Sequence, residues 1–148
     1  MKTVNILRLI TYICVFAGAW FGFDSISKKN IHKGLREIMG IGVVPLAFIS
    51  GIRHMFYHGS IIKNQRFFEF EAGGANIGIA LAGLLSLINN MNNDAMGVIF
   101  LIYAVYLFMG TIAWVYIIKR SRSAMIIGFL SITGLLSYSS YIAFTNKN

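Results

Sequence analysis

Residues 95–118 read AMGVIFLIYAVYLFMGTIAWVYII and contain no charged side chain. A helix needs roughly 20 consecutive apolar residues to cross the hydrocarbon core of a bilayer. Because the stretch reaches that length without interruption, it predicts a transmembrane helix, and it is the clearest indication of the class to which the chain belongs.

Four other apolar runs accompany this stretch. The five predicted spans cover residues 4–23, 37–57, 67–88, 95–118 and 124–144. The connections between them are short, so consecutive helices are expected to be antiparallel neighbours. We therefore predict an all-α integral membrane protein, with one transmembrane domain over residues 1–148 that folds as a five-helix up-and-down transmembrane bundle.

The composition fits a membrane protein and excludes two other classes. Hydrophobic residues make up 57% of the 148 residues and charged residues 12%, with a mean hydropathy of +0.69, whereas a soluble domain is about 25% charged. A disordered chain is excluded as well, because it needs low hydrophobicity. Cys14 is the only cysteine, so a disulfide within the chain is excluded too.

The chain is also basic, with 13 Lys and Arg against 5 Asp and Glu and a net charge of +8. In a soluble protein this excess would favour nucleic-acid binding. Here the basic residues lie almost entirely between the apolar runs, where they anchor helices and contact anionic headgroups. We expect the lipid bilayer as a partner and no nucleic acid, while a homo-oligomer or another membrane subunit stays open.

The distribution of Lys and Arg predicts the orientation of the bundle. The larger group shares the side of the N-terminus and consists of Lys2, Arg8, Arg53, Lys63, Arg66, Lys119, Arg120 and Arg122. The smaller group lies opposite and consists of Lys28, Lys29, Lys33, Arg36 and Lys147. Since cytoplasmic segments carry the excess of positive charge, we expect a cytoplasmic N-terminus. Residues 27–37, SKKNIHKGLRE, are basic but lie on the side predicted to be external, which argues against this orientation. The conflict disappears if they lie on the membrane surface as a short basic amphipathic helix.

Ionisable residues inside a membrane are costly, which makes them candidate functional residues. Arg53 and His54 lie near the end of the second predicted span, and Glu69 and Glu71 lie near the start of the third. Only a short connection separates these spans, so the two ends meet at one membrane face. His54 and Glu71 both lie about 5–6 Å inside their boundaries at a rise of about 1.5 Å per residue, and contact between them is expected. Arg8, near the start of the first span, is expected to extend to the interface.

The candidate site therefore consists of His54, Glu71 and Asn76, with Arg53 and Glu69 beside them. Two interpretations stay open. In the first, a binding or transport protein uses the site for a proton or a small polar ligand, because histidine titrates near neutral pH. In the second, an accessory or structural membrane subunit uses a charged pair only to fix the register of two helices.

A metal site and an enzyme are less favoured. His54 and His58 are four residues apart, a spacing that places two metal ligands on one face of a helix. The pair lacks the glutamate of the HExxH motif, so it is a weak candidate, and we predict neither a metal ion nor a cofactor. No nucleophile with an activating base can be assigned, which leaves no candidate catalytic residue.

Small residues dominate residues 71–86, EAGGANIGIALAGLLS, and they let helix backbones approach closely. Glycines four residues apart, in the pattern GxxxG, occur here and in the first span. The predicted helix-packing positions are Gly73, Gly74 and Gly78 in the third span and Gly18 and Gly22 in the first. We expect the third span to be central in the bundle.

The two glutamates of the third span face different neighbours on the predicted helix. Spacings of four and three lead from Glu69 through Gly73, Asn76, Ala80 and Gly83, and from Glu71 through Ala75, Gly78 and Ala82. A pair of carboxylates that acts jointly in catalysis is therefore not expected.

Residues 51–87, GIRHMFYHGSIIKNQRFFEFEAGGANIGIALAGLLSL, resemble an uncharacterised family of small bacterial multi-spanning membrane proteins. The family pattern ends one span with Gly-x-His-x-Phe and opens the next with Phe-Gln-x-Glu-x-Gly-x-Ala-Asn. The matching residues are His54, Phe56, Phe68, Glu71, Gly73, Ala75 and Asn76. The sequence departs from the pattern at Glu69, where the family tends to have glutamine, and in the fourth span, which lacks a further histidine.

This resemblance implies the helical fold and the position of the site. It implies no activity, because none is established for the family. We expect the protein to lie in a bacterial cytoplasmic (inner) membrane.

Overall fold

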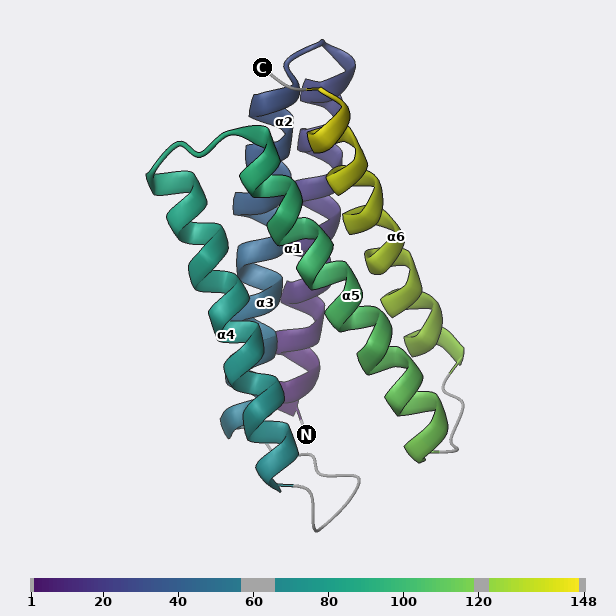
Figure 1. Ribbon diagram of the computed structural model, residues 1–148. Helices are drawn as coiled ribbons and strands as arrows, with labels where there is room; N and C mark the ends of the chain where they lie inside the picture. Colours follow the sequence, from purple (N-terminus) through teal and green to yellow (C-terminus); the bar gives the residue numbers. More distant parts are fainter. Residues whose placement is uncertain (1, 57–65, 119–122, 147–148) are drawn as a thin grey trace. The chain divides into compact units, whose positions relative to one another are not determined.

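The structure, a computed structural model, describes residues 2–56, 66–118 and 123–146. All regular elements in these ranges are helical (Figure 1). They are α1 (Lys2–Ser27), α2 (Ile31–Glu37), the π-helical segment η1 (Ile38–Val43), α3 (Val44–Phe56), α4 (Arg66–Ile88), α5 (Asn93–Ile118) and α6 (Ser123–Thr145). The chain divides into two compact units, Met1–Met91 (unit 1) and Asn92–Asn148 (unit 2).

Within the described residues, five helical stretches are long and apolar enough to cross a membrane. They are Asn5–Ser27, Ile31–Phe56, Glu69–Ile88, Asn93–Ala113 and Ile126–Thr145. The second stretch combines α2, η1 and α3, which follow one another without a break. The predicted all-α class and the five apolar helices are therefore confirmed.

The turn between the first two stretches is tighter than the sequence indicates. Residues 24–36 read as a connection, but only residues 28–30 separate α1 from α2. Lys29 reverses the chain with a left-handed backbone conformation (φ 63°). The side chain of Asn30 then caps α2 by accepting a hydrogen bond from the Lys33 amide at 3.3 Å. The basic segment is thus part of the helices and their turn, rather than a separate surface helix.

The π-helical segment has a local cause in Pro45. Proline lacks an amide hydrogen, and its ring clashes with the carbonyl four residues earlier in an α-helix, here that of Ile41. The wider turns of η1 end at Val43, two residues before this proline, and the Val44 amide donates to the carbonyl of Met39, five residues back. The extra residue in the turn keeps the stretch helical past a residue that would otherwise break it.

In unit 1, α1 packs against α2 and η1 through two pairs of glycines. A Cβ atom placed on Gly18 would lie 2.6 Å from the backbone nitrogen of Gly42. One placed on Gly22 would lie 2.8 Å from the carbonyl oxygen of Gly34. Backbone therefore meets backbone at both positions, and the predicted packing positions Gly18 and Gly22 are used within the chain.

The inner face of α4 packs against α3. A Cβ atom on Gly73 would lie 3.0 Å from the Gly51 carbonyl oxygen and 3.2 Å from the Met55 nitrogen. Farther along the same face, Ala80 is buried and a Cβ atom on Gly83 would meet the side chain of Val44 at 2.9 Å. We call the residues Gly73, Asn76, Ala80 and Gly83 the inner stripe of α4; all of them are buried.

The other stripe of α4 faces outward. We call Glu71, Gly74, Ala75 and Gly78 the outer stripe; all of them are exposed. Nothing lies within 4 Å of a Cβ atom placed on Gly74 or Gly78. The expectation that these two glycines pack a neighbouring helix is therefore not met in unit 1. Residues 73 and 74 differ by about 100° around the helix, and only the side of Gly73 faces α3.

Arg36 of α2 binds the far end of α4 and the turn that follows it. Arg36 donates from Nη1 to Asn90 Oδ1 at 2.8 Å and from Nη2 to the Leu87 carbonyl at 3.1 Å. A positive group at the C-terminus of a helix complements the helix dipole and binds its unpaired carbonyls. The charge of Arg36 thus has a structural use within unit 1.

Unit 2 is an antiparallel pair of helices, α5 and α6 (Figure 1). The Ser140 hydroxyl donates to the Gly97 carbonyl at 2.9 Å, and the Asn93 side chain donates to the Asn146 carbonyl at 2.9 Å. A Cβ atom on Gly97 would lie 2.9 Å from Cβ of Ala143. The pair is therefore held by close approach of the helices, by one interhelical hydrogen bond, and by one from α5 to the residue that follows α6.

Candidate functional site

His54 lies in the last turn of α3, where a second basic side chain contacts it. The distance between Arg53 Nη2 and His54 Nε2 is 3.3 Å. Because a guanidinium group has only donors, the histidine nitrogen accepts this hydrogen bond. Both side chains are half-buried.

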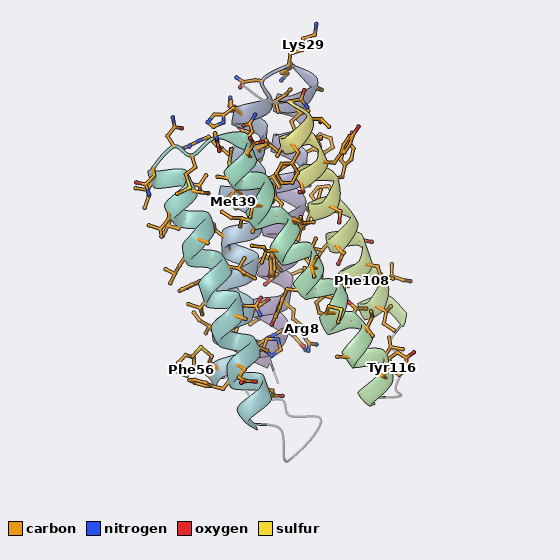
Figure 2. All side chains as sticks on the ribbon, viewed as in Figure 1. Arg8, Lys29, Met39, Phe56, Phe108 and Tyr116 are labelled. Atoms are coloured by element: carbon orange, nitrogen blue, oxygen red, sulfur yellow. The ribbon has the colours of Figure 1, made fainter. Side chains whose placement is uncertain are left out.

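Arg8 joins these two residues from α1. The first turns of α1 and the last turns of α3 lie at the same end of unit 1, where Figure 2 shows Arg8 and Phe56, whereas Lys29 marks the other end. The charges of Arg53 and Arg8 both act on the His54 ring. We call Arg8, Arg53 and His54 the basic cluster.

Within the basic cluster, Arg8 stands out by its hydrogen bonding. Its Nε atom is buried, and it has no hydrogen-bond partner among the described residues. A buried donor without a partner loses its hydration and gains nothing in return, which costs about 1–3 kcal/mol and more for a charged group. The end of unit 1 that carries the basic cluster therefore holds an unsatisfied cationic donor.

Glu71 does not join this cluster through any described contact. It is exposed on the outer stripe of α4, and neither a hydrogen bond nor an ion pair connects it to His54, although the structure describes both side chains. The two residues have similar depths along their helices, as the sequence indicates. They differ in direction around the helix axis, because α3 faces the inner stripe.

Asn76 and Glu69, unlike Glu71, lie on the side of α4 that faces α3. Asn76 is buried on the inner stripe, where its Nδ2 atom donates to the Ala72 carbonyl of its own helix at 2.8 Å. Glu69 is half-buried in the first turn of α4, four residues before Gly73 of the inner stripe. Of the two glutamates, Glu69 is therefore the one in phase with the face that α3 covers.

The predicted metal pair cannot be assembled from the described residues. His58 lies outside them, so its relation to His54 stays a prediction. Among the residues that the structure describes, no group of three or more His, Cys, Asp or Glu side chains could hold a metal ion.

Arg8 is a site residue that its local sequence does not identify, because a basic residue near the start of a span is expected at the interface. The predicted topology does indicate that Arg8 lies near His54. In an up-and-down bundle, the start of the first span shares a membrane face with the end of the second. The depth argument that joined His54 to Glu71 therefore applies equally to Arg8 and His54.

Comparison of the chain with protein-family models, curated proteins and solved structures finds no match. The resemblance of residues 51–87 to a family of bacterial membrane proteins accordingly stays a prediction. Function must be inferred from the geometry of the described residues.

Proposed function

We propose that the chain is an integral membrane protein of a bacterial cytoplasmic membrane that binds a small polar ligand at the basic cluster. The five apolar helices support a five-span bundle, because each is long enough to cross the hydrocarbon core. With a cytoplasmic N-terminus, as the distribution of Lys and Arg favours, the basic cluster lies near the cytoplasmic face.

The single observation that carries this proposal is the buried, unpartnered Nε of Arg8 beside Arg53 and His54. A cluster that only locked helices together would match each buried donor with an acceptor of the protein. A ligand with hydrogen-bond acceptors would satisfy the donor instead, provided that its binding opens the packing around Nε.

The test is the thermal unfolding of the detergent-purified protein beside the variant His54→Gln. A panel of small neutral, cationic and anionic molecules is added at increasing concentration. A ligand that binds only the native state raises the unfolding midpoint by mass action. We expect at least one compound to raise the midpoint of the wild type and to lose this effect in His54→Gln.

Lys29→Gln is the control for this test, because Lys29 is exposed at the opposite end of unit 1. It should respond as the wild type does. The proposal is wrong if no compound stabilises the wild type, or if His54→Gln and Lys29→Gln respond alike.

A second candidate function is that of an accessory membrane subunit, and the outer stripe of α4 favours it. Gly74 and Gly78 are exposed with open space around them, and small residues let a partner helix approach closely. The variant Gly78→Leu should therefore lose a co-purifying membrane partner while the isolated chain keeps its unfolding midpoint. Retention of every co-purifying protein by Gly78→Leu would exclude this function for the stripe.

A further inference from the structure

An open hollow of about 440 Å³ lies on the exposed side of α1. We call it the α1 groove, and the residues that line it are Phe16, Ala19, Trp20, Phe23, Asp24 and Ser27. Two of its aromatic side chains are largely exposed, Phe16 at 71% and Trp20 at 66%. Gly18 and Gly22, through which α1 packs in unit 1, do not line the groove. It therefore belongs to a face of α1 that the packing of unit 1 leaves open.

The α1 groove runs from the hydrocarbon core to the membrane surface if α1 spans a bilayer. From Phe16 to Ser27 the helix rises by about 16 Å, at about 1.5 Å per residue. Ser27 is also the last residue of the apolar stretch Asn5–Ser27. One leaflet contributes about 15 Å to the hydrocarbon core. The groove therefore matches the length of an acyl chain in one leaflet.

The two ends of the α1 groove differ in chemistry. At the deep end, the rings of Phe16 and Trp20 stack with their centroids 6.3 Å apart and form an apolar wall. At the surface end, the Asp24 carboxylate pairs with Lys28 Nζ at 2.6 Å. The Ser27 hydroxyl donates to the Asp24 carbonyl and is thus engaged by its own helix. The groove therefore suits a molecule with an apolar chain and a charged headgroup.

The ion pair at the surface end favours a headgroup with both charges. The side chains of Lys28 and Asp24 are 69% and 51% exposed. An exposed ion pair contributes little to stability because water screens its charges, so the pair can open readily. A zwitterionic headgroup then places its ammonium group at Asp24 and its phosphate at Lys28. An anionic headgroup would gain only the contact with Lys28 and would meet the like charge of Asp24.

Among zwitterionic headgroups, ethanolamine matches the groove better than choline does. The primary ammonium group of ethanolamine donates hydrogen bonds to a carboxylate, whereas the quaternary ammonium group of choline has no N–H donor. The face of an indole ring attracts both cations. Trp20, one helical turn before Asp24, therefore supports either headgroup, and the carboxylate of Asp24 decides between them.

We propose that the α1 groove binds one phospholipid with an ethanolamine headgroup. Its acyl chain lies along Phe16 and Trp20, its ammonium group contacts Asp24, and its phosphate contacts Lys28. The site requires the proposed membrane location. It is independent of the ligand of the basic cluster, because that cluster lies at the opposite end of unit 1.

The experiment uses the fluorescence of Trp20 in lipid vesicles. Trp20 and Trp114 are the only tryptophans of the chain, so Trp114→Phe leaves one reporter in the groove. The full chain is reconstituted in phosphatidylcholine vesicles. An increasing fraction of that lipid is then replaced by phosphatidylethanolamine, phosphatidylcholine or phosphatidylglycerol with brominated acyl chains. Bromine quenches an indole that it contacts, and the quenching curves give the relative affinities of the three lipids.

We expect phosphatidylethanolamine to bind at Trp20 about threefold more tightly than phosphatidylcholine, the effect of one exposed charge contact. Asp24→Asn should remove this preference and leave Lys28 to favour phosphatidylglycerol. Glu71→Gln, which removes the same charge outside the groove, is the matched control and should keep the preference. Lys28→Gln should weaken both zwitterionic lipids, whereas Lys29→Gln should not.

Each contrary outcome overturns the inference. Equal quenching by the three lipids would mean that α1 contacts only the bulk bilayer. Absence of quenching by all of them would mean that protein, such as a second copy of the chain, covers the groove. The inference is also wrong if Asp24→Asn keeps the preference for phosphatidylethanolamine, or if Glu71→Gln loses it. These measurements do not involve His54, so their failure leaves the proposed ligand of the basic cluster standing. Failure of the ligand test with His54→Gln likewise leaves the α1 groove untouched.

Discussion

The two stripes of α4 have nearly the same composition and opposite environments. The inner stripe, with Gly73 and Asn76, is buried against α3, and the outer stripe, with Glu71, Gly74 and Gly78, is exposed. Both contain closely spaced small residues, so composition alone does not distinguish them. A stripe of small residues therefore identifies a surface that another helix can approach, while its direction around the axis decides whether a helix of the same unit does so.

The same difference separates the two glutamates at the start of α4. Glu69 precedes the inner stripe and is half-buried, whereas Glu71 belongs to the outer stripe and is exposed. Depth along a helix is thus a necessary condition for two side chains to meet across helices. The direction in which each side chain points around its helix axis is the second condition. By this condition Glu71 leaves the candidate site, and Arg8 joins it.

The largest expected difference in the free energy of unfolding is between leucine substitutions at two adjacent glycines of α4. Gly73→Leu places a side chain against the backbone of Gly51 and Met55, so one helix must move away from the other. We expect it to lower the free energy of unfolding by about 3 kcal/mol, the upper end for overpacking in a core. Gly74→Leu should change it by less than about 0.5 kcal/mol, because its Cβ points into open space.

The measurement for this pair is reversible unfolding in mild-detergent micelles, titrated with a denaturing detergent. Both variants add the same side chain at neighbouring positions, so propensity and hydrophobicity are matched. Equal losses of stability in the two variants would contradict the assignment of an inner and an outer stripe.

The helical class could be predicted from the sequence because apolar length is a property of each segment alone. The boundary of α2 could not, because the polar residues 24–36 resemble a connection, and the cap by Asn30 becomes recognisable only with the turn at Lys29. The close contact of Gly18 with Gly42 joins residues on different helices. Nothing in the local pattern of either residue identifies its partner.

The candidate site was predictable in part for the same reason. Arg53 and His54 were found because ionisable residues in an apolar run are conspicuous by themselves. The contribution of Arg8 depends on the packing of α1 beside α3, a tertiary property. The predicted pairing with Glu71 used depth alone, and the inner stripe shows that the helix turns this side chain away from α3.

The smallest expected differences in the free energy of unfolding concern the two glutamates at the start of α4. Glu69→Gln removes a negative charge from the first turn of α4, where it complements the helix dipole, and should lower the free energy of unfolding by about 0.5–1 kcal/mol. Glu71→Gln lies beyond the first turn on the exposed stripe and should change it by less than about 0.5 kcal/mol. The same detergent titration measures both. Glu71→Gln should also leave the ligand response of the wild type unchanged, because Glu71 has no described contact with the basic cluster. A loss of that response in Glu71→Gln would restore the pairing of Glu71 with His54 and remove the distinction between the stripes at this end of α4.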